Sequence, residues 1–253
     1  MKVYWGITAS RSYRRSIPHN EAIMLSAMGL WNGKGFRQKT LQWQDWALDS
    51  GGFVALNKQG DYPFGPDDYL KLIEERKPSW AASMDYPCEP EISRGALQTT
   101  AERIDATVDY AAYLCERSDR VVPVIQGYTI EDYTTCIDLM EFHGVPMHRV
   151  AIGSLCRRQR LSEIRALAWD LRLRIPKGTQ VHGFGVKLSA LRHSETWALF
   201  DSLDTNAWEF WKRMRVMHGV EKMSDQEAWF GYSSKMKSYI DAPRQLSLGQ
   251  REK

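Results

Sequence analysis

The chain is predicted to fold as an α/β protein, a (β/α)8 TIM-like barrel, because short β-type runs alternate with longer helical patterns along most of its 253 residues. This alternation is typical of successive βαβ units that build a parallel sheet. Most of the β-type runs are apolar throughout, as expected for strands that are covered on both faces. Barrels of this kind commonly form from about 200 to 250 residues, so residues 1–253 are expected to make one domain.

Seven runs have the composition of strands, one fewer than a closed barrel needs. They span residues 3–8, 46–50, 80–85, 121–126, 150–154, 181–186 and 198–203. The eighth strand is either hidden in residues 32–43 or missing. The sequence therefore leaves closure of the barrel open, with an incomplete or irregular barrel as the alternative.

Apolar residues three and four positions apart predict helices between these strands. The helices are expected over residues 67–76, 96–116, 130–142, 161–174 and 207–218. Thr129 supplies an N-cap hydroxyl ahead of the acidic first turn of 130–142. The segment from Pro243 onward begins with a helix-breaking residue and is mostly polar, so this C-terminal tail is expected to fray.

Composition and charge exclude several classes of protein. No stretch reaches the roughly 18 apolar residues of a membrane span, and residues 1–6 lack a signal-peptide pattern, which predicts a cytoplasmic protein. The four cysteines lie far apart and are predicted to be reduced thiols rather than disulfides or zinc ligands.

The net charge of +3 is too small to indicate a polyanionic partner. Arginine clusters are more informative, and they comprise Arg11, Arg14 and Arg15, then Arg157, Arg158 and Arg160.

Polar residues and glycines follow the predicted strands at the end where a parallel barrel carries its active site. In chain order they are Asp49 and Ser50, Asp85, Gln126 and Gly127, Gly153 and Ser154, Gly185 and Lys187, and Asp201 and Asp204. A single aspartate in such a place is also explained by capping of the next helix. Several carboxylates at one rim repel each other at low dielectric, so a binding or catalytic role explains the set better.

Phe53 and Phe184 each stand beside glycines, which let a flat ligand approach the backbone closely. Aromatic rings in such positions are able to sandwich a flat heterocycle, although an apolar residue at a strand end is more often part of the core. The two rings are therefore candidate stacking residues, with a plain core role as the alternative.

Four segments make this pattern more specific: WALDSGGF at 46–53, CEP at 88–90, GSLCRRQ at 153–159 and HGFGVK at 182–187. Together with Asp85, Gln126 and Asp204, they resemble the queuine tRNA-guanine transglycosylase superfamily, and most closely its short phage members called DpdA. Those members are DNA-guanine transglycosylases, which replace guanine in DNA with a 7-deazaguanine, an anti-restriction modification. The resemblance covers most of the chain between residues 46 and 208.

The resemblance implies a double displacement through two aspartates. Asp204 would attack the anomeric carbon of the target guanosine, release guanine and form a covalent glycosyl-aspartate. Asp49 would act as general base and take a proton from the incoming 7-deazaguanine, such as 7-cyano-7-deazaguanine. This follows the logic of retaining glycosidases, whose two carboxyls lie about 5 Å apart, so retention of configuration is predicted.

The resemblance also implies a purine site. The edges of the base would be bound by Asp85, Gln126 and the backbone around Gly153, and its faces by Phe53 and Phe184. The remaining residues expected at this site are Ser50, Gly127, Ser154, Gly185 and Lys187.

The chain departs from the tRNA enzymes because it lacks the clustered cysteines and histidine that hold their structural zinc. After Asp204 only the helix 207–218 and a short tail are expected, without the parts that grip tRNA. Both departures favour DNA over tRNA as the substrate. Neither a metal nor another cofactor is expected. The alternative is a tRNA-guanine transglycosylase that works without zinc.

The expected partners are DNA and the 7-deazaguanine base. A rim carboxylate cannot reach the anomeric bond of a base inside a duplex, so the target guanine is expected to be flipped out or single-stranded, with or without an accessory DNA-opening protein. The arginine clusters are expected to hold phosphates, with ordinary solvated loops as the alternative. His182 is at least as well explained as a satisfied core group as by catalysis, and Cys88 and Cys156 are better explained as small buried residues than as metal ligands.

Overall fold

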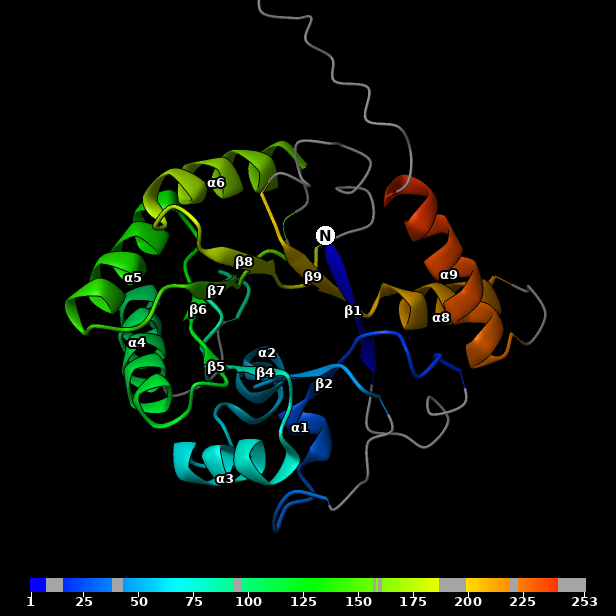
Figure 1. Cartoon of the computed structure of the whole chain (residues 1–253), viewed down its shortest axis with the longest axis horizontal. Helices are drawn as coiled ribbons and strands as arrows, with labels where there is room; N and C mark the ends of the chain where they lie inside the picture. The colour runs from blue at the N-terminus through cyan, green and yellow to red at the C-terminus, as the bar shows by residue number, and fades with distance from the viewer. Residues whose placement is uncertain are drawn as a thin grey trace, which may run out of the picture.

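In the computed structural model, parallel strands form a ring and helices cover its outside (Figure 1). The structure describes residues 1–7, 16–37, 43–92, 97–156, 158, 161–186, 199–218 and 223–240. The described strands are β1 (Lys2–Ile7), β2 (Ile23–Ser26), β3 (Trp46–Asp49), β4 (Trp80–Ala82), β5 (Val121–Val122), β6 (Val124–Ile125), β7 (Arg149–Ile152), β8 (Gln180–Gly183) and β9 (Ser202–Thr205). The described helices are α1 (Ala27–Leu30), α2 (Gly52–Val54), the π-helix η2 (Ala55–Gln59), α3 (Pro66–Arg76), α4 (Thr100–Arg117), α5 (Ile130–Phe142), α6 (Leu161–Arg174), α8 (Ala207–Met217) and α9 (Asp225–Ile240). The predicted α/β barrel is confirmed.

The ring returns to its start through one strand that Pro123 interrupts. The described strands follow the order β5-β4-β3-β2-β1-β9-β8-β7-β6, and every pair is parallel. β5 and β6, at the two ends of this order, are separated only by Pro123, whose carbonyl accepts a hydrogen bond from Ala151 N–H in β7 (2.9 Å). Proline has no N–H to donate to a ladder. The nine described strands thus make eight, of which the one formed by β5 and β6 is broken at Pro123.

β2 is the strand that the sequence pattern does not reveal. The pattern places the eighth strand in residues 32–43 or nowhere, and this is wrong, because the strand lies at Ile23–Ser26 between β1 and β3. The described part of the expected segment instead takes part in an isolated antiparallel bridge, between Trp31 and Phe36. An apolar run of four residues is too short to be distinguished by its periodicity.

β9 begins later than its apolar pattern indicates. The pattern places this strand at 198–203, whereas its ladder with β1 and β8 spans Ser202–Thr205. Leu199 and Phe200 are buried outside the ladder, and the ring of Phe200 fills the space beside Gly183. The shift moves Asp204 from a loop after the strand into the strand itself.

The five predicted helices are confirmed with small changes in their ends, and a further helix follows them. α5 has the expected N-cap, because Thr129 Oγ accepts a hydrogen bond from Asp132 N–H (3.2 Å). The expectation of only one helix after Asp204 is wrong: α9 packs beside α8 (Figure 1). Its apolar positions stand in an otherwise polar segment, which hides the helical pattern.

The predicted C-terminal tail from Pro243 lies outside the described residues. Within the described ranges no helix is long and apolar enough to cross a membrane.

Alternate strand residues fill the inside of the ring, as in other parallel barrels. The inward cluster consists of Tyr4, Ala22, Met24, Ala47, Trp80, Ala82, Val122, Val124 and Ala151. The residues between them, such as Trp5, Leu48 and Ile152, belong to a larger cluster with the helices. The interior is a packed core, so a ligand site is expected at one end of the ring.

The docking of α9 depends on Trp229, which is 5 % exposed and has its ring centroid 5.7 Å from that of Trp5 in β1. Because this side chain is buried, Trp229→Ala should lower the free energy of unfolding by about 3–5 kcal/mol in chemical denaturation. The matched control is Phe230→Ala, since Phe230 is 66 % exposed and its loss should change stability by less than about 0.5 kcal/mol. Equal losses in both variants would show that α9 does not dock through Trp229.

Candidate active site

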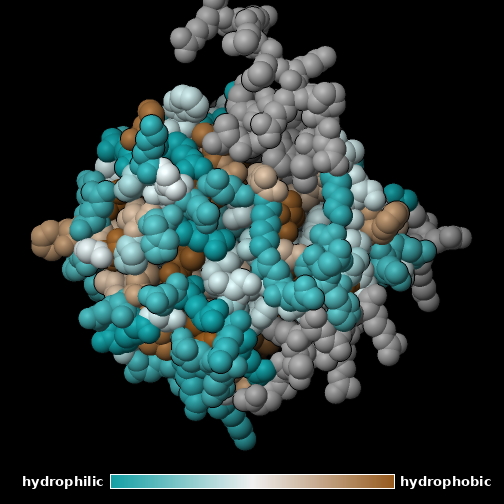
Figure 2. All heavy atoms as spheres, in the orientation of Figure 1, coloured by the Kyte–Doolittle hydropathy of each residue, from teal (hydrophilic) through white to brown (hydrophobic). Residues whose placement is uncertain are grey.

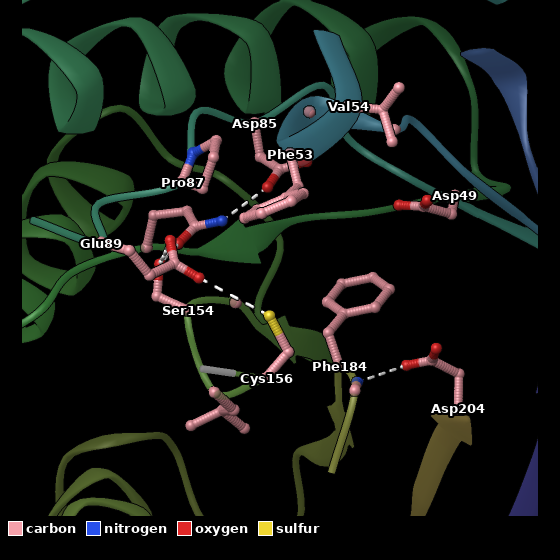
Figure 3. Close-up of a pocket in the computed structure, with 16 residues that line it drawn as sticks. Asp49, Phe53, Val54, Asp85, Pro87, Glu89, Ser154, Cys156, Phe184 and Asp204 are labelled. Atoms are coloured by element: carbon pink, nitrogen blue, oxygen red, sulfur yellow. Dashed lines mark hydrogen bonds between the residues drawn. The ribbon is translucent and has the colours of Figure 1, made fainter. Parts of the chain in front are cut away.

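A cavity of about 240 Å³ opens at the carboxyl-terminal ends of the strands (Figure 3). Nine of the residues expected at the site line it: Asp49, Phe53, Asp85, Gln126, Gly153, Ser154, Phe184, Gly185 and Asp204. The rest of the lining comes from Gly51, Gly52, Val54, Pro87, Glu89, Leu155 and Cys156. The common direction of the strands brings these residues together although they lie far apart in the sequence.

Asp85 forms the centre of a hydrogen-bonded chain on one side of the cavity. Ser50 Oγ donates to its Oδ1 (2.6 Å), and Gln126 Nε2 donates to its Oδ2 (2.5 Å). The hydroxyl of Tyr62 lies 2.9 Å from both Ser50 Oγ and the Asp85 carbonyl. Each carboxyl oxygen therefore has one fixed donor and keeps lone pairs for a ligand.

Gly153 allows Gln126 to reach Asp85. A methyl group at position 153 would lie 2.2 Å from Gln126 Nε2, which is far too close for a real contact. On its other side, the amide oxygen of Gln126 accepts a hydrogen bond from Ser154 Oγ (2.7 Å). The amide is thus held with its nitrogen toward Asp85 and its oxygen toward Ser154.

Glu89 is a buried carboxyl in the wall of the cavity. Its Oε2 lies 2.8 Å from Ser154 Oγ, and Cys156 Sγ donates to its Oε1 (3.7 Å; Figure 3). Ser154 Oγ also accepts a hydrogen bond from Cys88 N–H (3.0 Å). A hydroxyl has one proton, so Ser154 donates to either Glu89 or Gln126 at a time. Ser154 has a φ of +52°, an uncommon conformation that persists where surrounding contacts determine it.

Asp204 points into the ring from β9, in register with Tyr4 of β1. Its Oδ1 accepts a hydrogen bond from Gly185 N–H (2.7 Å; Figure 3), and His182 Nε2 lies 3.6 Å from the same oxygen. Glycine is required at position 185, because its φ is +62° and a methyl group there would lie 2.6 Å from Cys156 Cβ. The turn after β8 is therefore shaped to place one N–H on Asp204.

Asp49 ends β3 and has the most strongly shifted carboxyl of the cavity. Burial raises the pKa of Asp49 to about 7, the charges of Asp85 and Asp204 add to this shift, and the Gly51 N–H and the Ser26 hydroxyl oppose it. Burial also raises the pKa of Asp85, to about 6, against the donors Ser50 and Gln126. Near neutral pH these pKa values leave Asp85 mostly ionised and Asp49 partly protonated.

Phe53 and Phe184 both line the cavity, and both also contact the core. Phe53 packs against the small cluster of Leu56, Tyr86 and Ile92, and Phe184 packs against the inward cluster of the ring. The Phe184 ring centroid lies 4.8 Å from that of His182, edge to face. Core contact and exposure to the cavity are thus combined in each ring, and stacking on a ligand stays a prediction.

Ser50, Gly127 and Arg158 are expected at the site but do not line the cavity. Ser50 is buried behind Asp85, and Gly127 packs against the first turn of α5, where a methyl group would lie 2.6 Å from Tyr133 N. Arg158 donates to the Tyr128 carbonyl, and its guanidinium carbon lies 4.9 Å from the centroid of that ring. The predictions for Arg11, Arg14, Arg15, Arg157, Arg160 and Lys187 fall outside the described residues.

Tyr62 and Glu89 belong to the site but are not singled out by the sequence. Tyr62 stands in the loop before α3, where a tyrosine carries no periodic signal. The sequence gives one indication of Glu89: it belongs to the CEP segment at 88–90 and comes four residues after Asp85, which follows a predicted strand. Both act through contacts between distant parts of the chain, which composition and spacing do not encode.

Cysteines and acids are not gathered into a metal site: among the residues that the structure describes, no three His, Cys, Asp or Glu side chains are placed to hold an ion. Burial raises the pKa of Cys136 to about 12 and that of Cys88 further. Both therefore behave as small neutral side chains of the core.

A comparison with family models finds that DpdA, described as DeoxyPurine in DNA protein A, matches residues 36–229. The match covers more than half of the chain and includes every residue that lines the cavity. The chain belongs to the DpdA family. A search of curated proteins gives no match. All four motif segments that resemble DpdA lie within the matched range, so that resemblance is confirmed.

The Gln126 amide lowers the pKa of Asp85 because it donates a hydrogen bond to the charged form. Gln126→Leu should therefore raise this pKa above about 6, which a carbon-13 NMR titration of the aspartate carboxyls would measure. The control is Gln180→Leu at the exposed start of β8, which should leave the Asp85 titration unchanged. An unchanged or lower pKa in Gln126→Leu would contradict the hydrogen-bonded chain.

Proposed function

We propose that this chain is a base-exchange transglycosylase that replaces guanine in DNA with a 7-deazaguanine derivative. The observation that carries the proposal is that one cavity is lined by two pairs of side chains, Asp49 with Asp204 and Asp85 with Gln126. The first pair suits displacement at an anomeric carbon, and the second suits the polar edge of a purine. Membership of a family described as DeoxyPurine in DNA supports DNA as the polymer.

In the first displacement Asp204 is the nucleophile. Its Oδ1 accepts from Gly185 N–H, which leaves Oδ2 to form an ester bond with C1′ of the target deoxyguanosine. The bond from C1′ to N9 breaks, its electron pair moves onto guanine, and Asp49 gives a proton to the departing base. A carboxyl with a pKa of about 7 is partly protonated at neutral pH and is suited to this transfer.

The second displacement follows the same path in reverse. Ionised Asp49 takes the proton from the ring nitrogen of the incoming 7-deazaguanine, and that nitrogen attacks C1′. The ester bond breaks, and its electron pair returns to the Asp204 carboxylate. Two inversions at one carbon retain the configuration, so the product keeps the β-glycosidic geometry of DNA.

Recognition of the base falls to the hydrogen-bonded chain around Asp85. An ionised carboxylate accepts two parallel N–H bonds from a guanine-type edge, and the Gln126 amide presents a donor and an acceptor. A cavity of about 240 Å³ is smaller than the roughly 300 Å³ at which pockets for drug-sized ligands begin, which suits a single base. Phe53 and Phe184 line the same space and supply stacking faces. Guanine and a 7-deazaguanine share this edge, so one site serves both.

The polymer has to present an extrahelical base. The cavity opens at the strand ends, so a guanine must leave the stack or be single-stranded to reach it. Arg158 follows β7 at the same end of the ring, where it donates to the Tyr128 carbonyl, and it is the described arginine that we propose to contact backbone phosphate.

Incorporation of labelled guanine tests the proposal. Radiolabelled guanine with a single-stranded DNA oligonucleotide should give label in DNA, because the first displacement is reversible, and Asp204→Asn should abolish this incorporation and any covalent protein–DNA adduct. Asp138→Asn on the exposed face of α5 is the matched control and should keep full activity. Label in unmodified tRNA alone would make the chain a tRNA-guanine transglycosylase, and label in neither polymer would contradict the exchange reaction.

The pH dependence of the first displacement tests Asp49. This step needs Asp49 protonated, so in single-turnover measurements the release of guanine should slow as pH rises through about 7. The step that uses the incoming base needs the ionised form and should show the opposite trend. In Asp49→Asn the decline through about pH 7 should be lost, together with most of the rate, typically 100-fold or more for a proton-transfer residue. Persistence of the decline in this variant would assign it to another group.

A further inference from the structure

His182 is a buried histidine next to the proposed nucleophile, and the reaction described above does not use it. Its side chain is fully buried, and its Nδ1 lies 2.9 Å from Ser202 Oγ. Its Nε2 has no hydrogen-bond partner within the described part of the chain and lies 3.6 Å from Asp204 Oδ1. A buried polar atom without a partner is uncommon and calls for an explanation.

The register of β8 and β9 produces this arrangement. His182 is paired with Ser202, and Asp204 lies two residues further along β9. Successive residues of a strand point to opposite faces, so Ser202 and Asp204 both point inward with His182. The imidazole therefore lies between the Ser202 hydroxyl and the Asp204 carboxyl.

The surroundings of the ring favour one tautomer. If Ser202 Oγ donates to Nδ1, the ring proton is on Nε2 and points toward Asp204 Oδ1. The opposite tautomer would direct the lone pair of Nε2 at a carboxylate oxygen and would leave a buried acceptor without a donor, which costs free energy. The Nε2–H form is therefore the stable one while Asp204 is ionised.

We propose that His182 is a positioning residue for Asp204. Its Nε2–H and the Gly185 N–H hold Oδ1 from two sides, which leaves Oδ2 directed at the anomeric carbon. A small closing movement brings the 3.6 Å separation to hydrogen-bond length. In the covalent intermediate Oδ1 becomes the ester carbonyl oxygen and keeps both donors. This inference rests on the proposed role of Asp204 as nucleophile.

The groups around the ring keep the imidazole neutral. Tyr4, Trp80 and Phe184 surround it with aromatic rings at centroid distances of 5.9, 4.9 and 4.8 Å. Burial lowers the pKa of His182, Asp204 opposes this, and the charge of Arg149, whose guanidinium lies over the Trp80 ring, lowers it further. A neutral donor orients the carboxylate without removing its charge, whereas an imidazolium would pair with it and weaken the nucleophile.

Two conservative variants separate the roles of the two ring nitrogens. The amide nitrogen of glutamine reaches about the position of Nε2, and that of asparagine reaches the position of Nδ1. His182→Gln should retain the rate of covalent intermediate formation within about threefold, whereas His182→Asn should lose about 10- to 100-fold, as for one hydrogen bond to a charged group. Guanine affinity, measured by isothermal titration calorimetry, should stay the same in both variants, because His182 does not line the cavity.

Equal rates in wild type, His182→Asn and His182→Gln would overturn the inference, and so would parallel losses of rate and guanine affinity. If Asp204→Asn keeps covalent capture, the proposed function fails; if it abolishes capture while both His182 variants react at the wild-type rate, only this inference fails. Should a variant not fold, nitrogen-15 NMR of the wild-type chain decides, because the proposal requires the neutral Nε2–H tautomer. A neutral ring protonated on Nδ1 would overturn it.

Discussion

All strands of the ring run in one direction, and this constraint decides where the polar chemistry of the molecule lies. The ends of separate strands meet at one rim, which is why Asp49, Asp85 and Asp204 share a single cavity although they come from distant parts of the chain. Like charges in a poorly solvated space repel each other and oppose folding unless donors or protons compensate. The residues around the three carboxyls supply that compensation, each in a different way.

The kind of compensation gives each carboxyl a different chemical character. Asp85 has two side-chain donors that stabilise its charge and fix its plane, as a group that reads a ligand edge requires. Asp204 has a main-chain donor on Oδ1, and among the described residues no such donor reaches its Oδ2. Asp49 is half-buried near both of these charges and is compensated by partial protonation near neutral pH. Close packing at Gly153 and Gly185 makes these contacts sterically feasible.

Much of this arrangement could be predicted from the sequence, because barrel strands and amphipathic helices are periodic and the active end of a parallel barrel is fixed by strand direction. The residues that end the strands, such as Asp49 and Gln126, were therefore identifiable, and the match to DpdA confirms the resemblance that the four motif segments carried. β2 and α9 were not identifiable, since a four-residue strand and an interrupted apolar stripe give weak periodic signals.

The contacts within the site were beyond the reach of sequence patterns for a different reason. The neighbours of Asp85 include Ser50 and Tyr62, which are separated from it by 35 and 23 positions, and their hydroxyls meet it only in the folded barrel. The displaced start of β9 had a similar origin, because the apolar pair at 199 and 200 is buried without belonging to the ladder. The pKa values follow from this packing and not from spacing.

The pairing of β1 with β9 links assembly of the ring to its chemistry. Tyr4 and Asp204 are partners in that ladder, although they stand at positions 4 and 204 of the chain. The carboxyl at position 204 therefore depends on the N-terminal strand for its place, whereas β3, which carries Asp49, has its own partners in β2 and β4. The two ends of the described barrel thus meet at the wall of the cavity that holds Asp204.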